Sequence, residues 1–429
     1  MLWRHPRLTL FALLLGVLAA GTAAVFFWAQ HHLEAAQLAL QRYAFEEARR
    51  HLDLCLKVRW RSAAVHLLAA QTARRCEAYD EAEQRLAESI QLVGMTPAAA
   101  LERMLLSAQQ GELDGVESSL RGRASGDDPN AGLVLEALAK GYASRFWDSQ
   151  ALECLNLLLE RQPQHPHALL MRARAWEKLA RQGETEREQD ALRDYEKAVE
   201  LGPSFESQLG LAGALYRVGR PWQAMRAYER LRSLQPAHPE VLLGLARCRY
   251  NLHEVDAARQ PLDELLGPYP HHAAALLERG RLALHAGQLT DAERWLRRAA
   301  AVAPGHDLEG LRLLCCCLEA SHQSTEAQRC REELRRKEAE VLDLERKIRR
   351  SIRGLQDVAL RYEIATALMR LGREQDGVAS LFFVLDQQPG HGPARAALAD
   401  YFERSGQPSR AAHYRRAGLA KANTGIPSR

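Results

Sequence analysis

The sequence predicts an all-α fold, a solenoid of stacked helical hairpins, from three observations. Pro236, Pro270 and Pro304 follow one another at equal spacing, since 270 − 236 = 304 − 270 = 34. Small residues return at two fixed positions of this register. The 429-residue chain is 47% hydrophobic but only 6% aromatic, which favours helices rich in Ala and Leu. A fixed period of about 34 residues is typical of helical hairpins.

Three consecutive hairpins between Phe205 and His306 define the register. Small residues are expected where two helices cross, and larger apolar residues are expected to fill the gap against the next hairpin. A glycine or polar residue interrupts the middle of each hairpin: Gly219, His253 and Gly287. Four columns hold the small and apolar residues: Ala212, Ala246 and Gly280; Ala224, Ala258 and Ala292; Tyr228, Leu262 and Leu296; and Leu231, Leu265 and Ala299.

The segment 286–294, Ala-Gly-Gln-Leu-Thr-Asp-Ala-Glu-Arg, is followed ten residues later by Pro304. It resembles the tetratricopeptide repeat family, and the whole chain is similar to membrane-anchored bacterial members of it. The resemblance implies a right-handed superhelix of antiparallel helix pairs whose concave face binds a protein or peptide. It does not name the partner.

The amino terminus, residues 1–30, predicts a transmembrane signal-anchor helix. Arg4 and Arg7 precede Leu8–Ala29, a run of 22 residues without a charge. As a helix this run is about 33 Å long, enough to cross a hydrocarbon core of about 30 Å. A cleaved signal peptide is the alternative. The two arginines place Met1 in the cytoplasm and the remainder outside, in the periplasm of a bacterium, with the chain crossing the inner membrane once.

The remaining chain divides into repeats of differing quality. Residues 31–130 hold degenerate repeats that end in a loop rich in helix breakers, Arg121–Asn130. Residues 131–306 hold well-formed repeats, with about six extra residues in the polar stretch Ala180–Gln189. Residues 358–421 add two repeats, and 422–429 form a tail. We count ten or eleven hairpins from residue 31 to 420, which leaves no room for a catalytic domain.

Residues 307–357 predict a divergent repeat with a long charged helix from Ser324 to about Gly354. Leu334, Val341 and Ile348 recur every seven residues along it. Such a narrow stripe fits a solvated helix that lies against the solenoid, or a short dimerising coiled coil. The oligomeric state stays open.

Composition excludes several functions. The net charge of +4, from 58 basic and 54 acidic residues, argues against a nucleic-acid binder. The eight cysteines contain no Cys-x-x-Cys pair, so we expect buried apolar thiols, with disulfides only in an oxidising compartment. The chain has no phosphate loop, zinc-protease pair or nucleophile elbow, so we expect no enzyme, cofactor or metal site. The recurring histidines are expected to be polar residues at helix starts: His165, His238, His272, His306 and His391.

A basic column on the first helix of successive hairpins is the candidate ligand-binding groove. Such a trough would hold an acidic peptide or a terminal carboxylate. The alternative is that neighbouring carboxylates, such as Glu136 and Glu278, neutralise these charges in place. The candidate residues are Lys140, Arg174, Lys178, Arg217, Arg247, Asn251, Arg281 and His285.

The sequence therefore predicts a non-enzymatic protein–protein interaction scaffold, anchored in the membrane, that binds an acidic protein or peptide partner in its concave groove. The alternative function is a periplasmic assembly factor for cytochromes or envelope complexes.

Overall fold

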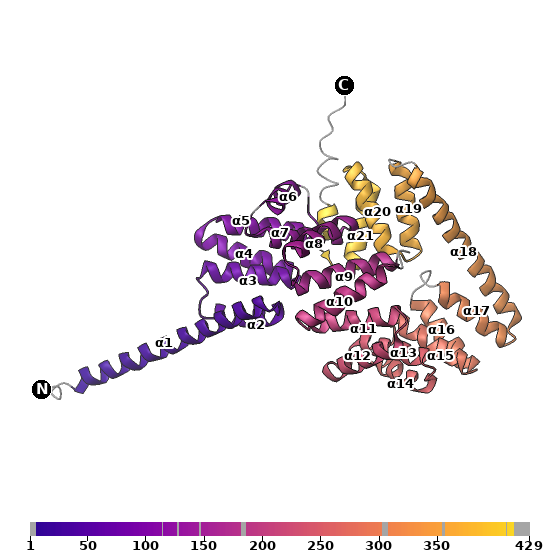
Figure 1. Cartoon of the computed structure of the whole chain (residues 1–429), viewed down its shortest axis with the longest axis horizontal. Coiled ribbons are helices and arrows are strands. Elements are labelled where there is room, and N and C mark those ends of the chain that lie inside the picture. The colour runs from indigo at the N-terminus through magenta and orange to yellow at the C-terminus, as the bar shows by residue number, and fades with distance from the viewer. Residues whose placement is uncertain are drawn as a thin grey trace, which may run out of the picture. The chain divides into compact units, whose positions relative to one another are not determined.

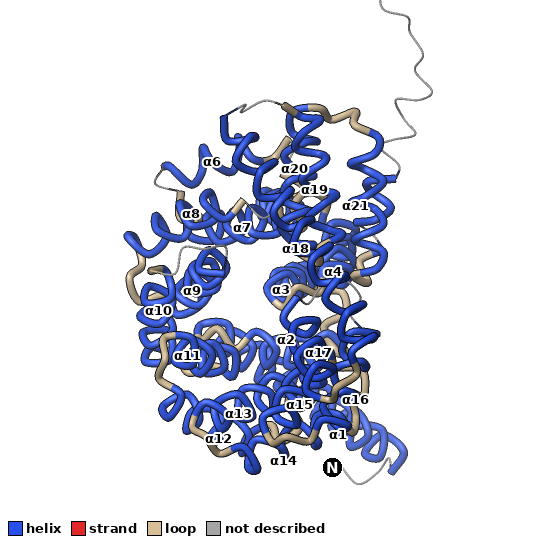
Figure 2. The backbone as a smooth tube through the Cα atoms, turned by 90° about the vertical axis from the view of Figure 1, so that its right-hand side faces the viewer, coloured by secondary structure: helices blue, strands red, loops and turns tan. Residues whose placement is uncertain are grey.

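The computed structural model describes residues 6–113, 115–126, 128–145, 147–181, 186–302, 308–353, 357–408 and 410–415. All regular elements in these ranges are helices, joined by short loops (Figures 1 and 2). The all-α fold predicted from the sequence is therefore confirmed for the part of the chain that is described.

The helices form two compact units. Unit 1 comprises Met1–Ser144, Asp148–Ala175 and Glu200–Gly202; unit 2 comprises Arg145–Trp147, Trp176–Val199 and Pro203–Arg429. Within unit 1, α1 packs on α2, α3 on α4 and α7 on α8. Its helices are α1 (Pro6–Gln41), α2 (Phe45–Leu56), α3 (Ala63–Arg75), α4 (Tyr79–Val93), α5 (Pro97–Gln109), α6 (Glu117–Ser125), α7 (Ala131–Ser144), α8 (Asp148–Arg161) and the first part of α9 (Pro166–Arg181).

Unit 2 contains the hairpins with the clearest register. Here α11 packs on α12, α13 on α14, α15 on α16 and α19 on α20. Its helices are the end of α9, most of α10 (Arg187–Leu201), α11 (Phe205–Arg217), α12 (Pro221–Leu234), α13 (Pro239–Asn251), α14 (Val255–Leu266), α15 (Ala273–His285), α16 (Leu289–Val302), α17 (Leu308–Ala320), α18 (Ser324–Arg353), α19 (Val358–Arg370), α20 (Glu374–Gln387) and α21 (Gly392–Arg404).

The four predicted columns of small and apolar residues form the core of the hairpins from α11 to α16. Every member is buried. At Gly280 an added Cβ would lie 2.7 Å from Cγ of Leu296, so only glycine allows this approach of α15 and α16. The predicted interruptions are also confirmed: Gly219, His253 and Gly287 have φ of +77°, +64° and +71° and end the first helix of each hairpin.

Helix α1 runs without a break across residue 30, the boundary that the sequence suggested between an anchor and the first repeat. Ala29, Ala36 and Ala39 are buried, whereas the described side chains from Gly16 to Trp28 are exposed. Figure 1 shows this part of α1 extending away from the other helices of unit 1. Among the described residues, no helix combines the length and apolar character that a membrane crossing requires. Residues 1–5 lie outside the described ranges.

Two other predicted segments differ from the structure. Arg121–Ser125, expected as part of a loop, is the end of the nine-residue helix α6. Leu120 and Ala124 of this helix are buried, so packing overrides the breakers nearby. The polar stretch Ala180–Gln189 is helical at both ends, in α9 and α10, and residues 182–185 lie outside the described ranges.

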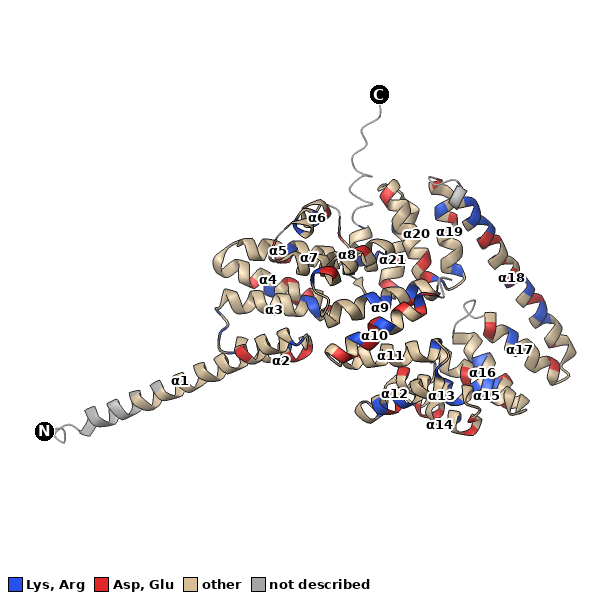
Figure 3. Ribbon diagram, viewed as in Figure 1, with Lys and Arg blue, Asp and Glu red and all other residues tan. Residues whose placement is uncertain are grey.

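The predicted long helix is confirmed as α18, and its two ends pack against different neighbours. Leu334 contacts a cluster with α17, and Ile348 contacts a cluster with α19. The expected seven-residue stripe is not the buried one, because Leu344, and not Val341, is buried. Figure 3 shows acidic and basic residues alternating along the rest of α18.

A disulfide between Cys315 and Cys330 joins α17 to α18, with 5.5 Å between their Cα atoms. Cys316, between two buried cysteines of α17, is exposed. The triplet therefore splits between a disulfide, the surface and the core, as neighbouring residues of one helix must.

Three of the recurring histidines cap a helix from the position just before its first residue. Nδ1 accepts a hydrogen bond from the backbone N–H three residues later at His165 (3.1 Å), His272 (3.2 Å) and His391 (3.1 Å). They replace the usual Ser, Thr or Asp at the capping position before a helix. His238 is also the residue before a helix but makes no such bond, and His306 lies outside the described residues.

Candidate binding surfaces

The eight residues predicted to line a groove lie on the first helices of successive hairpins. Lys140 on α7 and Arg174 on α9 belong to unit 1. The others belong to unit 2: Lys178 on α9, Arg217 on α11, Arg247 and Asn251 on α13, and Arg281 and His285 on α15. The two sets are described separately below.

In unit 2, Arg247 and Arg281 share one carboxylate. Nε of Arg247 lies 2.8 Å from Oε1 of Glu278, and Nη1 of Arg281 lies 2.9 Å from its Oε2. The Glu278 side chain is 8% exposed, whereas those of Arg247 and Arg281 are 37% and 22% exposed. Arg281 also binds Glu309 of α17, whose side chain is 61% exposed. The buried carboxylate therefore holds two guanidinium groups at the surface.

The position of Glu278 follows from the repeat. It lies 34 residues after Gly244, which lies 34 after Gly210. An added Cβ at Gly210 or Gly244 would meet the ring of Tyr195 or Tyr228 within 2.2 to 2.3 Å. In the next hairpin, Leu262 takes the place of the tyrosine. A smaller side chain there leaves room for the glutamate.

The other predicted residues of unit 2 also have neighbours. Nη1 of Arg217 lies 3.1 Å from Glu177, and Nδ2 of Asn251 donates a 3.2 Å hydrogen bond to the hydroxyl of Tyr216. The ring of His285 packs edge-on against that of Tyr250, with centroids 5.8 Å apart. Lys178 is half-buried. The predicted residues of unit 2 therefore do not form a row of unpaired charges, because carboxylates and aromatic side chains lie against them.

In unit 1, Arg174 is exposed, and Lys140, only 11% exposed, lies 3.3 Å from Glu77. Glu136, which the sequence suggested as a partner of Lys140, instead pairs with His167 at 3.1 Å and with Arg75 at 3.9 Å. Burial alone would raise the pKa of Glu136. The hydrogen bond and charge of His167, with the charges of Arg75 and Lys140, lower this pKa far below its ordinary value.

No pattern in the sequence indicates that the turn between α1 and α2 contacts this region. The Tyr43 ring lies 4.7 Å from that of His165, and the Phe45 ring lies 5.4 Å from that of His167, between centroids. Burial lowers the pKa of His165, an effect that nearby His167 and Arg75 add to and Glu136 opposes. These contacts join residues about 120 positions apart, so no local pattern could reveal them.

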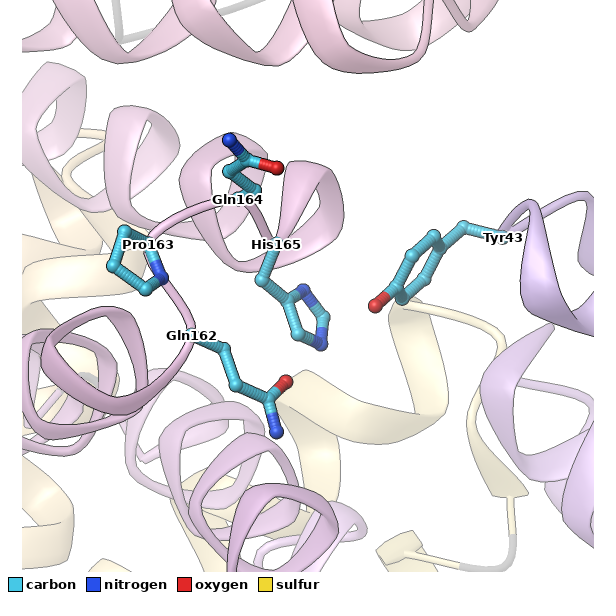
Figure 4. A pocket seen from close by; sticks show the side chains of 5 residues that line it. All are labelled: Tyr43, Gln162, Pro163, Gln164 and His165. Atoms are coloured by element: carbon cyan, nitrogen blue, oxygen red, sulfur yellow. The ribbon is translucent and has the colours of Figure 1, made fainter.

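A small pocket of about 340 Å³ lies between this turn and the α8–α9 connection. Its lining is Tyr43, Gln162, Pro163, Gln164 and His165 (Figure 4). Nδ1 of His165 already accepts the N–H of Ala168, so the ring is held as part of the helix start. The pocket offers amide and hydroxyl groups but no charged side chain.

Comparisons with known proteins identify the repeats. Residues 215–270 and 262–307 each match a family model described as tetratricopeptide repeat. The "Protein CTR9 homolog" of Arabidopsis thaliana is 31% identical over 99 residues, 23% of this chain and 9% of that protein. The chain thus spans less than a tenth of the length of this relative.

Two solved structures are similar at low identity. PilW, titled a widely conserved type IV pilus biogenesis factor, is 21% identical with a TM-score of 0.42, and the match covers 47% of this chain and 91% of PilW. The human IFIT1 dimer with PPP-AAAA is 14% identical with a TM-score of 0.41, covering 84% of this chain and 91% of that chain. Neither likeness identifies a partner for this chain.

Proposed function

We propose that this chain, a protein of the tetratricopeptide repeat family, is a non-enzymatic scaffold that binds an acidic segment of a partner protein on the first-helix surface of α11–α17. Proteins of this family bind protein or peptide partners in general. The observation that carries the acidic specificity is the pair of arginines, Arg247 and Arg281, held by one nearly buried glutamate, Glu278.

In this arrangement, a carboxylate of the partner can replace one that belongs to this chain. Each guanidinium has five N–H donors, and Glu278 uses only part of them. The contact between Arg281 and exposed Glu309 is a surface ion pair, which contributes about 0–1 kcal/mol. A carboxylate of the partner can replace Glu309 at little cost. Because Glu278 fixes both arginines beforehand, little side-chain entropy is lost on binding.

The partner is found with a photo-cross-linking amino acid in place of Asn251, which is exposed at the end of α13. The same amino acid in place of Glu264, on α14, is the control for non-specific capture. The captured protein is identified by mass spectrometry and purified for binding measurements.

The affinity test removes the arginines without stranding a charge. In Arg247→Met/Glu278→Met/Arg281→Met no buried carboxylate stays unpaired, whereas reversing the arginines alone would leave Glu278 among like charges. We expect binding at least about tenfold weaker, because hydrogen bonds between charged groups contribute about 1.5–3 kcal/mol each. The matched control, Arg232→Met/Glu264→Met, removes a 2.7 Å pair between α12 and α14 and should bind normally. Equal affinity of the triple variant and the wild type would reject the acidic site.

We also propose that the start of α1 anchors the scaffold in the inner membrane, with the repeats in the periplasm. Support comes from the 22 uncharged residues Leu8–Ala29 and from the exposed side chains Val17, Leu18 and Phe27. The full chain should resist alkaline carbonate extraction from membranes, and a chain lacking residues 2–29 should be extracted. Mass spectrometry of the mature amino terminus tests cleavage, the alternative.

The disulfide between Cys315 and Cys330 favours the same placement, because disulfides persist mainly in oxidising compartments. A periplasmic assembly factor for cytochromes or envelope complexes is the second candidate function. Loss of haem-stained cytochromes in a deletion strain, restored by the wild-type gene, would favour it over a general scaffold.

A further inference from the structure

Exposed apolar side chains of unit 1 gather at the edge from which α1 extends. Outside α1, five large apolar side chains of the described part of unit 1 are exposed. Four lie in two successive places: Trp60 between α2 and α3, and Leu92, Val93 and Met95 where α4 ends and leads to α5. The fifth, Leu157, lies within α8.

Contacts hold these segments side by side. Nη2 of Arg59 donates a 2.8 Å hydrogen bond to Oε1 of Gln30, and its guanidinium lies 4.4 Å above the Phe26 ring of α1. Oγ of Ser89, near the end of α4, donates a 2.9 Å hydrogen bond to the carbonyl of Ala63 at the start of α3. Figure 1 shows the α2–α3 and α4–α5 connections on the side of unit 1 toward which α1 extends. The exposed stretch of α1 and these two connections therefore form one edge.

The charge of this edge is positive. Residues 57–62 contain Lys57, Arg59 and Arg61 and no acidic residue, and residues 92–97 contain no charge. Arg61 lies over the ring of Trp60, 4.6 Å from its centroid. Glu88, one turn before Leu92, is neutralised by Arg85 at 3.2 Å and faces His66 at 2.9 Å.

We propose that this edge, formed by residues 57–62 and 92–96, rests on the surface of a bilayer that contains anionic phospholipid. The inference depends on the proposed anchoring by α1 and adds where the folded body touches the lipid. Tryptophan and arginine are typical of the membrane–water interface, and basic residues near an anionic surface are attracted to it. A lipid surface covers the apolar side chains that water would otherwise meet.

The experiment measures depth-dependent quenching in vesicles. The full chain carries Cys316→Ser, which removes the exposed thiol, and one new cysteine, Ser62→Cys or Met95→Cys, labelled with bimane. The matched control is Leu157→Cys, exposed in the same unit but away from the edge. Each protein is reconstituted with vesicles of phosphatidylcholine alone or with phosphatidylglycerol, containing lipids spin-labelled near the headgroup. Flotation of the vesicles reports anchoring independently.

We expect at least about twofold stronger quenching at 62 and 95 than at 157, and stronger quenching with phosphatidylglycerol. Lys57→Gln/Arg61→Gln should remove the phosphatidylglycerol effect without changing flotation, whereas Arg50→Gln/Arg103→Gln, two exposed arginines elsewhere in unit 1, should not. If the chain floats but all three positions are quenched equally, the edge does not touch lipid and anchoring alone stands. If the chain does not float, both proposals fail.

Discussion

Glutamates on the first helices of the hairpins are buried with cations from neighbouring helices. Arg74 of α3 binds Glu102 of α5, with Nη2 3.2 Å from Oε2. Glu136 of α7 pairs with His167, and Glu278 of α15 with Arg247 of α13. A buried carboxylate is strongly unfavourable without a partner, so each pair specifies which helices lie next to each other.

The pair at Glu136 makes a prediction about pH. Because its folded pKa is lowered, ionised Glu136 stabilises the fold above its unfolded pKa of about 4.5, and this contribution is lost as pH falls below that value. Glu136→Gln should lower the free energy of unfolding by about 3 kcal/mol at pH 7 and by less at pH 4. Urea unfolding at both values measures this. Glu83→Gln, at an exposed position of α4, is the control. A deficit that does not change with pH would contradict the assignment.

Burial also sets the reactivity of the thiols. It raises the pKa of Cys154 and Cys248 to about 12, with smaller contributions at Cys154 from Arg121, which lowers the pKa, and from Glu153 and Glu117, which raise it. The thiolate is the reactive form, so both should be inert in the folded chain. Cys316 is exposed. Iodoacetamide at pH 8 should label one site per native chain within minutes, and mass spectrometry should locate it at Cys316. Rapid labelling of Cys248 would show that α13 opens readily.

At the scale of the element, the sequence predicts best where packing is local. The hairpins from α11 to α16 were predicted from columns of small residues, because the crossing of two adjacent helices fixes those residues. The helical end of α6 and the burial of Leu344 in α18 were not predicted, because contacts with residues farther along the chain determine both. In α18, Leu344 packs against Leu360 and Ile364 of α19, across a connection that no periodicity marks.

Close approach of α12 and α13 gives a steric prediction. An added Cβ at Gly244 would lie 2.3 Å from Cζ of Tyr228, so Gly244→Ala forces one helix to shift. We expect a loss of about 1–3 kcal/mol in the free energy of unfolding, measured with urea. The second change Tyr228→Leu should recover part of it, because Leu262 opposes a larger residue in the following hairpin.

Gly213→Ala on α11 is the control for helix propensity. Its added Cβ would lie 3.3 Å from Arg217 and 3.6 Å from Tyr228, at the far ends of both side chains. This variant should be neutral or more stable by up to about 1 kcal/mol. A double variant less stable than Gly244→Ala alone would reject the ring as the cause of the loss.

At the scale of the whole molecule, the candidate site shows what spacing can and cannot supply. The pair of Glu278 with Arg281 joins residues three apart on one helix and was expected from the sequence. Glu177 and Glu309 each reach their basic partner from another helix, Glu77 reaches Lys140 from the turn between α3 and α4, and Tyr43 reaches His165 from four hairpins away. The sequence alone predicts the contact within one helix, whereas the contacts between distant segments depend on how the hairpins stack.

The stacking of hairpins predicts that a destabilising substitution has only a local effect. In a repeat protein, stability is approximately a sum of free-energy terms within hairpins and between neighbouring hairpins. A substitution in one hairpin should therefore open only the helices near it. Glu136→Gln should speed amide hydrogen exchange in α3, α7 and the first turn of α9 by up to about a hundredfold, for a loss of about 3 kcal/mol. Exchange in α13–α16 should stay unchanged. Gly244→Ala should give the reverse map, with faster exchange in α12 and α13 and unchanged exchange in α3, α7 and the first turn of α9. Exchange that rises equally along the chain in either variant would mean that all the hairpins unfold together, and the nearest-neighbour description would then be wrong.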